Sequence, residues 1–138
     1  MTRQYTRGFI RVVRLALNAV LKQDRASTGN PYPSGYRPAQ YHAVDGAKSI
    51  AGHILTRGHY KKRFEGYPLS NVELMAAIDG SVGFELTKDD RWLLQELEDY
   101  HDITSEQLQI LGGTFTARLR SHLYKNADLL PDIFKEYH

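Results

Sequence analysis

The 138-residue chain contains no cysteine. This absence excludes disulfides, thiolate catalysis, and zinc or iron–sulfur sites built on cysteine. The sequence also lacks any run of about 18 apolar residues, the length that a membrane-spanning helix needs. It contains no glycine-rich phosphate loop, nucleophile elbow or His-Glu-x-x-His motif. We therefore predict a cytoplasmic protein that is not an enzyme, that needs no cofactor and that has no membrane partner.

The composition is that of an ordinary globular domain. Hydrophobic residues make up 41% of the chain and charged residues 25%, which argues against extensive disorder. A chain of this length buries enough surface for one hydrophobic core. We predict a single domain over residues 1–138. Its basic helical half, residues 1–69, carries tyrosine-rich loops, and its acidic helical half comprises residues 70–138.

The net charge of +2 hides an asymmetry along the chain. Residues 1–63 contain 12 Lys and Arg but only two acids, whereas residues 64–138 contain six Lys and Arg and 14 acids. A basic half attracts phosphates or acidic proteins, and an acidic half repels nucleic acid or imitates it. Alternatively, the two halves pack together and partly neutralise each other, so the charge pattern alone does not name a partner.

Residues 6–23 follow the period of an amphipathic helix. Its predicted apolar face consists of Phe9, Val13, Ala16, Leu17, Val20 and Leu21. The opposite face carries Arg3, Arg7, Arg11, Arg14 and Lys22. No acid occurs before Asp24. This basic row is either a solvated face or a surface for a phosphate backbone or an acidic partner.

Two loop segments combine aromatic residues with turn-forming or basic ones. Residues 27–38 contain three prolines and two glycines, which predicts a stiff loop. Residues 58–69 place cations among aromatic side chains, a pattern that suits phosphates and unpaired bases. The candidate nucleic-acid contacts are Lys61, Lys62 and Arg63. The candidate anchors for a partner are Tyr32, Tyr36, Tyr60 and Tyr67, unless these rings pack over the core.

A second helix is expected between Pro38 and Gly58, since proline suits the first helical position. Its predicted apolar stripe consists of Tyr41, Val44, Ala47, Ala51, Ile54 and Leu55. Gly46 and Gly52 each weaken a helix by about 1 kcal/mol relative to alanine, so we expect close packing there. The histidines at 42 and 53 would lie about 16 Å apart along such a helix, too far to share one metal ion.

The next segment predicts two further helices. Ser70 with Glu73 forms a capping-box pattern, and Asp79-Gly80 marks the end of that helix. Residues 80–86 are either a short strand or an irregular link. Thr87, followed by the acids Asp89 and Asp90, is another capping-box-like start, of a helix that is expected to end near Tyr100. It would bury Trp92, Leu93, Leu97 and Tyr100 and present an acidic outer face made of Glu96, Glu98 and Asp99.

The C-terminal third predicts a short helix, a glycine turn and an amphipathic helix. Thr104 is expected to cap the short helix, Gly112-Gly113 to break it, and Thr114 to cap the next, in which Leu119 and Leu123 share a face with Phe115. One uninterrupted helix over 104–125 is the alternative, because two glycines cost only about 2 kcal/mol. A last short helix is expected after Pro131.

Residues 88–126 resemble a helix-turn-helix domain of the winged-helix kind, as found in phage and mobile-element proteins. The resemblance rests on Ile103-Thr104-Ser105, on the spacing from Leu108 to Gly113, and on Ala117-Arg118-Leu119-x-x-x-Leu123. It implies that the major groove is approached by Thr114, Thr116, Arg118, Arg120 and Ser121, and that Lys125 meets a phosphate. No acid occurs between Glu106 and Asp128, which agrees with this expectation.

The sequence therefore predicts an all-α protein, a compact bundle of five to six helices whose C-terminal part is helix-turn-helix-like. The expected function is non-catalytic nucleic-acid binding, as in a small regulator of phage or mobile-element type. The alternative is a phage-type inhibitor, similar to anti-CRISPR proteins, that occupies a surface of a host protein complex.

Overall fold

The computed structural model describes residues 3–137, and the secondary structure there is helical. The elements are α1 (Arg7–Gln23), α2 (Ile50–Ile54), η1 (Lys62–Phe64), α3 (Val72–Val82), α4 (Lys88–Leu111), α5 (Phe115–Lys125) and η2 (Asp132–Tyr137), where η marks a 3₁₀ helix. No β-strand forms within residues 3–137, although isolated antiparallel bridges join Thr28 to Ala39 and His42 to Lys48. The predicted all-α class is confirmed. Among the described helices, none has both the length and the apolar character to cross a membrane.

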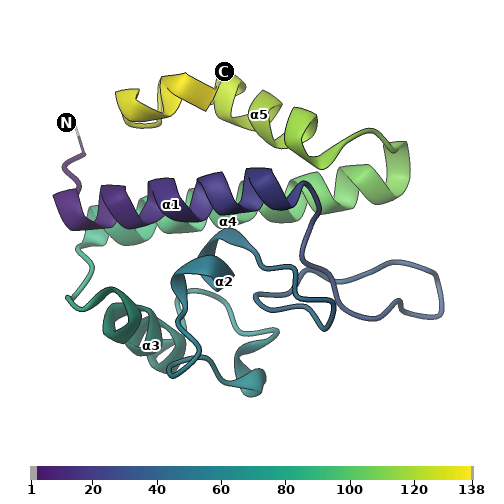
Figure 1. Ribbon diagram of the computed structural model, residues 1–138, viewed down its shortest axis with the longest axis horizontal. Helices are drawn as coiled ribbons and strands as arrows, with labels where there is room; N and C mark the ends of the chain where they lie inside the picture. The colour runs from purple at the N-terminus through teal and green to yellow at the C-terminus, as the bar shows by residue number, and fades with distance from the viewer. Residues whose placement is uncertain (1–2, 138) are drawn as a thin grey trace.

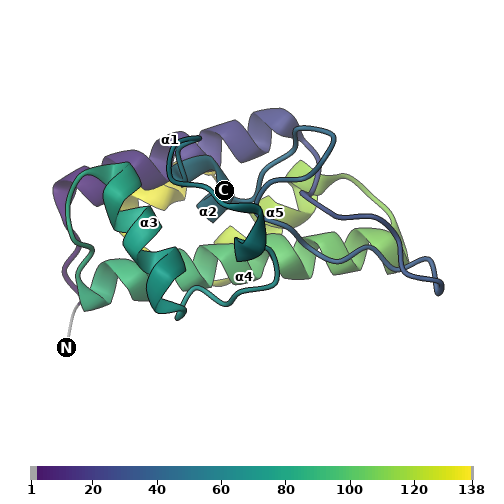
Figure 2. The same cartoon turned by 90° about the horizontal axis from the view of Figure 1, so that it is seen from below.

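Two long helices, α1 and α4, run along the longest axis of the molecule (Figure 1). The short helix α2 packs against both of them, and α5 contacts both from the opposite side (Figures 1 and 2). The helix α3 packs against α2, and η2 lies against α5. The core lies where these faces meet, and its largest fully buried side chains include Phe9, Phe64, Phe115 and Phe134.

The first helix agrees with the amphipathic pattern of residues 6–23. Its side chains at Phe9, Val13, Leu17 and Val20 are fully buried. The following residue, Asp24, adopts a left-handed conformation with φ of 52° and ends the helix. The prediction of an amphipathic helix is confirmed.

The capping box predicted at the start of α4 is confirmed. The Thr87 side chain accepts a hydrogen bond from the Asp90 N–H, and the Asp90 carboxylate accepts one from the Thr87 N–H, both at 3.1 Å. This arrangement satisfies two backbone donors that the first helical turn otherwise leaves open.

The predicted end of this helix near Tyr100 and the predicted second start at Thr104 are both wrong. α4 continues without a break to Leu111. Thr104 lies inside it and is fully buried, because the buried face continues through the polar residues that follow Tyr100. No glycine or proline occurs between Thr87 and Gly112, so nothing local stops the helix earlier.

The predicted helix over 38–58 is also wrong, except for α2. The Ala43 N–H donates to the Ala47 carbonyl, and Gly46 between them has a φ of 91°, so this stretch is a tight turn. Val44, predicted on the apolar stripe, is 93% exposed at the turn. Gly46 thus serves the turn and not helix packing, since a Cβ there would meet nothing within 4 Å.

Gly52 has the close packing that the sequence predicted for it. A Cβ at this position would lie 1.9 Å from the carbonyl oxygen of Tyr41. Only glycine therefore lets α2 approach the chain segment that precedes it.

The third helix begins and ends later than predicted. Asn71, and not Ser70, is its N-cap, with a side chain that accepts from a backbone N–H of the first turn. The helix passes through Asp79-Gly80, where an end was expected, and stops at Gly83, whose φ of 88° is left-handed. Residues 84–86 connect it to α4 without forming a strand.

The turn at Gly112-Gly113 separates α4 from α5, so the alternative of one helix over 104–125 is wrong. The Thr114 side chain accepts from the Ala117 N–H at 3.3 Å, which confirms it as the N-cap of α5. The predicted inner face of α5 is confirmed, because Phe115, Leu119 and Leu123 are buried. Figure 1 shows α5 turning back over α4.

Candidate functional site

The outer face of α1 carries three of the predicted arginines side by side. Arg7, Arg11 and Arg14 line a groove of about 400 Å³ together with Ile10, Leu15 and Asn18. We call this feature the arginine groove. Its lining contains no acid. Within residues 3–137, neither Arg7 nor Arg11 forms an ion pair, and both are exposed.

Arg14 differs from the other two because η2 partly neutralises it. Its guanidinium donates to Glu136 at 2.9 Å. This bond raises the pKa of Arg14 above its usual value, so the side chain stays charged. Tyr137, the next residue of η2, adds a second bond between η2 and α1, because its hydroxyl donates to Asn18 at 2.7 Å.

Arg3 does not belong to the groove. Its guanidinium carbon lies 3.6 Å from the centre of the Trp92 ring on α4, a cation–π arrangement. Trp92 was predicted to be buried but is only half-buried. Arg3 covers one face of the ring.

At α5, three of the residues predicted to face a DNA groove already have partners within the protein. The Thr114 hydroxyl caps the helix. The Thr116 hydroxyl donates to Asp24 at 2.6 Å, at the end of α1. The Arg118 Nε donates to the Gly112 carbonyl at 2.6 Å, so its half-buried side chain leans back on the turn before α5. None of these contacts pairs an arginine with a carboxylate.

The other predicted residues of α5 face solvent. Arg120, Ser121 and Lys125 are exposed, and in the described part of the chain none of them forms an ion pair. This exposed face can meet an anionic partner without rearrangement of the core.

The three basic residues before α3, Lys61, Lys62 and Arg63, differ in whether they have a partner within the described part of the protein. Lys61 and Lys62 are exposed, whereas Arg63 is bound to the carboxylate of Glu73 through two N–H donors. This bidentate pair fixes η1 to the first turn of α3. Arg63 is therefore less available to a phosphate than its two neighbours.

The four tyrosines fall into two classes. Tyr32 and Tyr36 are 55% and 41% exposed, and their ring centres lie 6.2 Å apart at the tip of the 27–38 loop. Tyr60 is half-buried, stacks on His42 with ring centres 4.0 Å apart, and donates to Glu65 at 2.6 Å. Tyr67 is also half-buried and packs against the core. Only the first pair is presented as a contact surface.

The most perturbed acid of the molecule was not predicted from the sequence. Glu98 was expected on the outer acidic face, but it is 4% exposed and points into the protein. Its carboxylate accepts from the Ser49 hydroxyl at 2.7 Å and from the Ala51 N–H at 3.2 Å. Burial raises the pKa of Glu98 to about 7. A signal was present in the sequence, because Glu98 is one turn from Leu94 on the buried face of α4.

The structure thus offers two separate features, exposed cations on α1 and on α5 and a buried acid on α4. Comparison with known proteins assigns no family to the chain. No family model, curated protein or solved structure matches it.

Proposed function

We propose that the protein is a non-catalytic nucleic-acid-binding protein, a small regulator of the phage or mobile-element type. The observation that carries the proposal is the arginine groove on α1. It presents Arg7 and Arg11 to solvent without an acidic partner in the described residues, and Arg14 lies beside them.

The spacing of the groove residues suits a phosphate backbone. At positions i, i+4 and i+7 of one helix, Arg7, Arg11 and Arg14 span about 10 Å along the axis. A nucleic-acid strand carries one phosphate per about 3.4 Å of axis, so this row covers about three phosphates. Guanidinium groups bind phosphate oxygens through two parallel N–H donors.

The exposed face of α5 would supply the second contact. Arg120 and Ser121 would approach base edges, and Lys125 would meet a phosphate, as the resemblance to helix-turn-helix domains implies. Arg118 would join them by giving up its bond to the Gly112 carbonyl. In this proposal α5 acts as the recognition helix and α1 binds the phosphate backbone.

The test is a salt series of binding to random-sequence duplex DNA, followed by fluorescence anisotropy. Affinity should fall steeply with salt. The double variant Arg7→Gln/Arg11→Gln should lower the slope of log affinity against log salt by about 0.9 for each phosphate that is no longer neutralised. Arg118→Ala/Arg120→Ala should also lower it. The matched control is Arg25→Gln/Arg57→Gln, which removes the same charge outside the groove. Equal slopes for groove and control variants would contradict the proposal.

A second candidate function is favoured by the exposed pair Tyr32 and Tyr36. Exposed aromatic rings on a stiff loop are typical anchors of protein interfaces. In this alternative the protein is an inhibitor of the anti-CRISPR kind that covers a surface of a host protein complex. Undetectable DNA binding at low salt, together with a tightly bound protein in a pull-down that Tyr32→Ala/Tyr36→Ala abolishes, would decide for it.

A further inference from the structure

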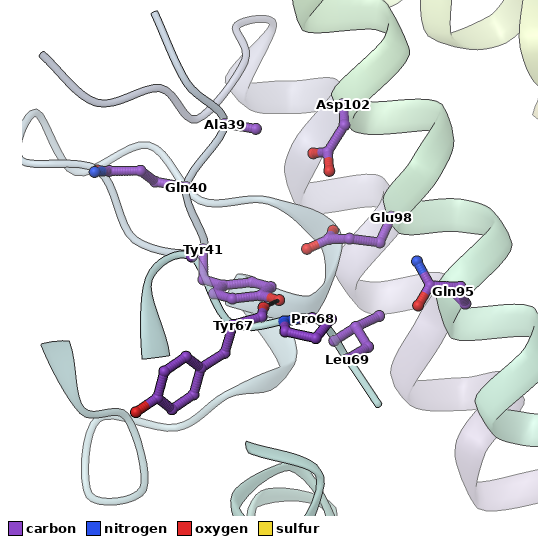
Figure 3. A pocket seen from close by; sticks show the side chains of 10 residues that line it. Ala39, Gln40, Tyr41, Tyr67, Pro68, Leu69, Gln95, Glu98 and Asp102 are labelled. Carbon is purple, nitrogen blue, oxygen red and sulfur yellow. Dashed lines mark hydrogen bonds between the residues drawn. The ribbon is translucent and has the colours of Figure 1, made fainter. Parts of the chain in front are cut away.

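A cavity of about 260 Å³ lies between α4 and two loop segments. One wall is formed by Gln95, Glu98 and Asp102 on α4, and the other by residues 39–41 and 66–69. Figure 3 shows the carboxylates of Glu98 and Asp102 pointing from the same side of α4 into this space. The cavity is separate from the arginine groove, and no residue lines both.

The lining of the cavity is anionic. It contains two carboxylates but no lysine, arginine or histidine. Glu98 is 4% exposed, and the groups that donate to it, the Ser49 hydroxyl and the Ala51 amide, are both neutral. Because a buried charge is stable only when it is compensated, an ionised Glu98 favours a cation in the adjoining space.

His101, which contacts Asp102, uses both of its ring nitrogens in hydrogen bonds within the protein. The Ser27 N–H donates to the Nε2 atom of His101 at 3.0 Å, so this nitrogen carries a lone pair. The Nδ1 atom then carries the proton and donates to Asp102 at 2.9 Å. His101 thus orients one oxygen of Asp102 and does not itself line the cavity.

The remaining groups around the cavity set its shape and polarity. The second oxygen of Asp102 accepts no hydrogen bond in the described part of the chain, and this side chain is 48% exposed. The Tyr41 ring forms part of the wall and is held by a bond from its hydroxyl to the Tyr67 carbonyl. An aromatic face attracts cations. Pro68 and Leu69 add apolar surface.

We propose that this cavity binds a primary ammonium group on a short aliphatic stem, which donates hydrogen bonds to Glu98 and Asp102. The N–H donors of an ammonium group match the acceptor oxygens of the two carboxylates. The stem would lie against Tyr41, Pro68 and Leu69. Among the described residues, no cluster of three or more metal-ligating side chains is present, and the apolar wall suits an organic cation better than a metal ion. A free alkylamine and a lysine side chain share this chemistry.

The test is an NMR titration of the ¹⁵N-labelled protein with n-butylammonium chloride at pH 8, where Glu98 is ionised. Sodium chloride at equal ionic strength is the reference. The Ala51 amide is the main reporter, because it donates directly to Glu98. We expect saturable shifts at Ala51 and Tyr41. Tetramethylammonium, which has no N–H donor, should give less than a third of the response.

Three variants locate the site. Glu98→Gln should raise the Kd for n-butylammonium at least tenfold, and Asp102→Asn at least threefold. The matched control, Glu106→Gln, removes the same charge from an exposed position on α4 and should change the Kd less than twofold. Asp102→Asn alters a half-exposed side chain, so it decides the question even if Glu98→Gln destabilises the fold.

The source of the ammonium group is tested with the methylamide of acetyl-lysine. Binding comparable to n-butylammonium assigns the cavity to a lysine side chain, and binding of n-butylammonium alone assigns it to a free amine. The proposal is overturned if no shift saturates beyond the sodium chloride reference, if tetramethylammonium binds equally well, or if Asp102→Asn and Glu106→Gln behave alike.

Discussion

The two long helices use their charges in opposite ways. The cations of α1 at Arg7 and Arg11 are exposed and form no ion pair within residues 3–137. Two acids of α4 instead accept hydrogen bonds from other segments, Asp90 from Thr6 and Glu98 from Ser49. The acidic half therefore does not neutralise α1 by direct pairing, except where Glu136 reaches Arg14. Asp90 and Glu98 thus join segments of the fold, whereas Arg7 and Arg11 stay exposed.

The burial of Glu98 gives the sharpest test of the structural role of α4. Its pKa is raised from 4.5 to about 7 in the folded state. Between these two values the unfolded chain loses the proton while the folded chain keeps it. Stability should therefore fall as pH rises from 4.5 to 7, by about 3 kcal/mol at 1.36 kcal/mol per pKa unit.

Urea unfolding of the wild type and of Glu98→Gln across this pH range measures the effect. The variant should lack this part of the pH dependence and should be the more stable protein at pH 8. Glu106→Gln serves as the control with the same charge change. A wild-type stability that rises by the same amount over this interval would contradict the assignment to Glu98.

A second test addresses the start of α4. The carboxylate of Asp90 is fully buried and accepts from the Thr6 N–H at 2.9 Å, the Thr6 hydroxyl at 2.6 Å and the Thr87 N–H. Asp90→Asn replaces one acceptor oxygen by a donor and should destabilise the protein by about 2 kcal/mol. Asp89→Asn changes a neighbouring acid that accepts one hydrogen bond within residues 3–137, from the Gln4 N–H, and should cost less than about 0.5 kcal/mol by the same measurement. Equal losses of stability in Asp90→Asn and Asp89→Asn would show that the bonds from Thr6 to Asp90 do not join the start of α1 to α4.

The smallest effect concerns the ion pair between Arg14 of α1 and Glu136 of η2. Glu136→Gln removes the acid that holds Arg14. The freed guanidinium should tighten binding to duplex DNA about threefold and steepen the salt dependence by up to about 0.9. Fluorescence-anisotropy titrations at several salt concentrations measure both the affinity for DNA and its salt dependence. Glu85→Gln, an exposed acid outside the groove, should leave both unchanged, and a threefold gain in this control as well would point to net charge alone.

Local patterns predicted the elements whose signals lie within a few residues. The helix over 6–23, the capping box at Thr87 and the cap at Thr114 are all present. Periodicity and capping act over one or two helical turns, so a single sequence carries them. The arginines of the first helix were recognised for the same reason.

Predictions failed where distant segments decide the structure. The tight turn at Gly46 replaced most of the helix expected over 38–58. The polar residues Thr104 and Ser105 resemble a helix start, but they are buried inside α4. Glu98 was grouped with the neighbouring acids Glu96 and Asp99, although its position one turn after Leu94 favoured the buried face; its partners Ser49 and Ala51 lie 49 and 47 residues away.

The sequence by itself determined the helical class, the outward row of arginines and the caps of the last two α-helices, since each follows from neighbours along the chain. The tertiary structure alone decided which arginine side chains have a partner within residues 3–137 and which do not. Arg14, Arg63 and Arg118 found partners, while Arg7, Arg11 and Arg120 remained exposed. It also enclosed Glu98 beside a cavity, because burial and its effect on pKa depend on segments that meet only in the folded protein.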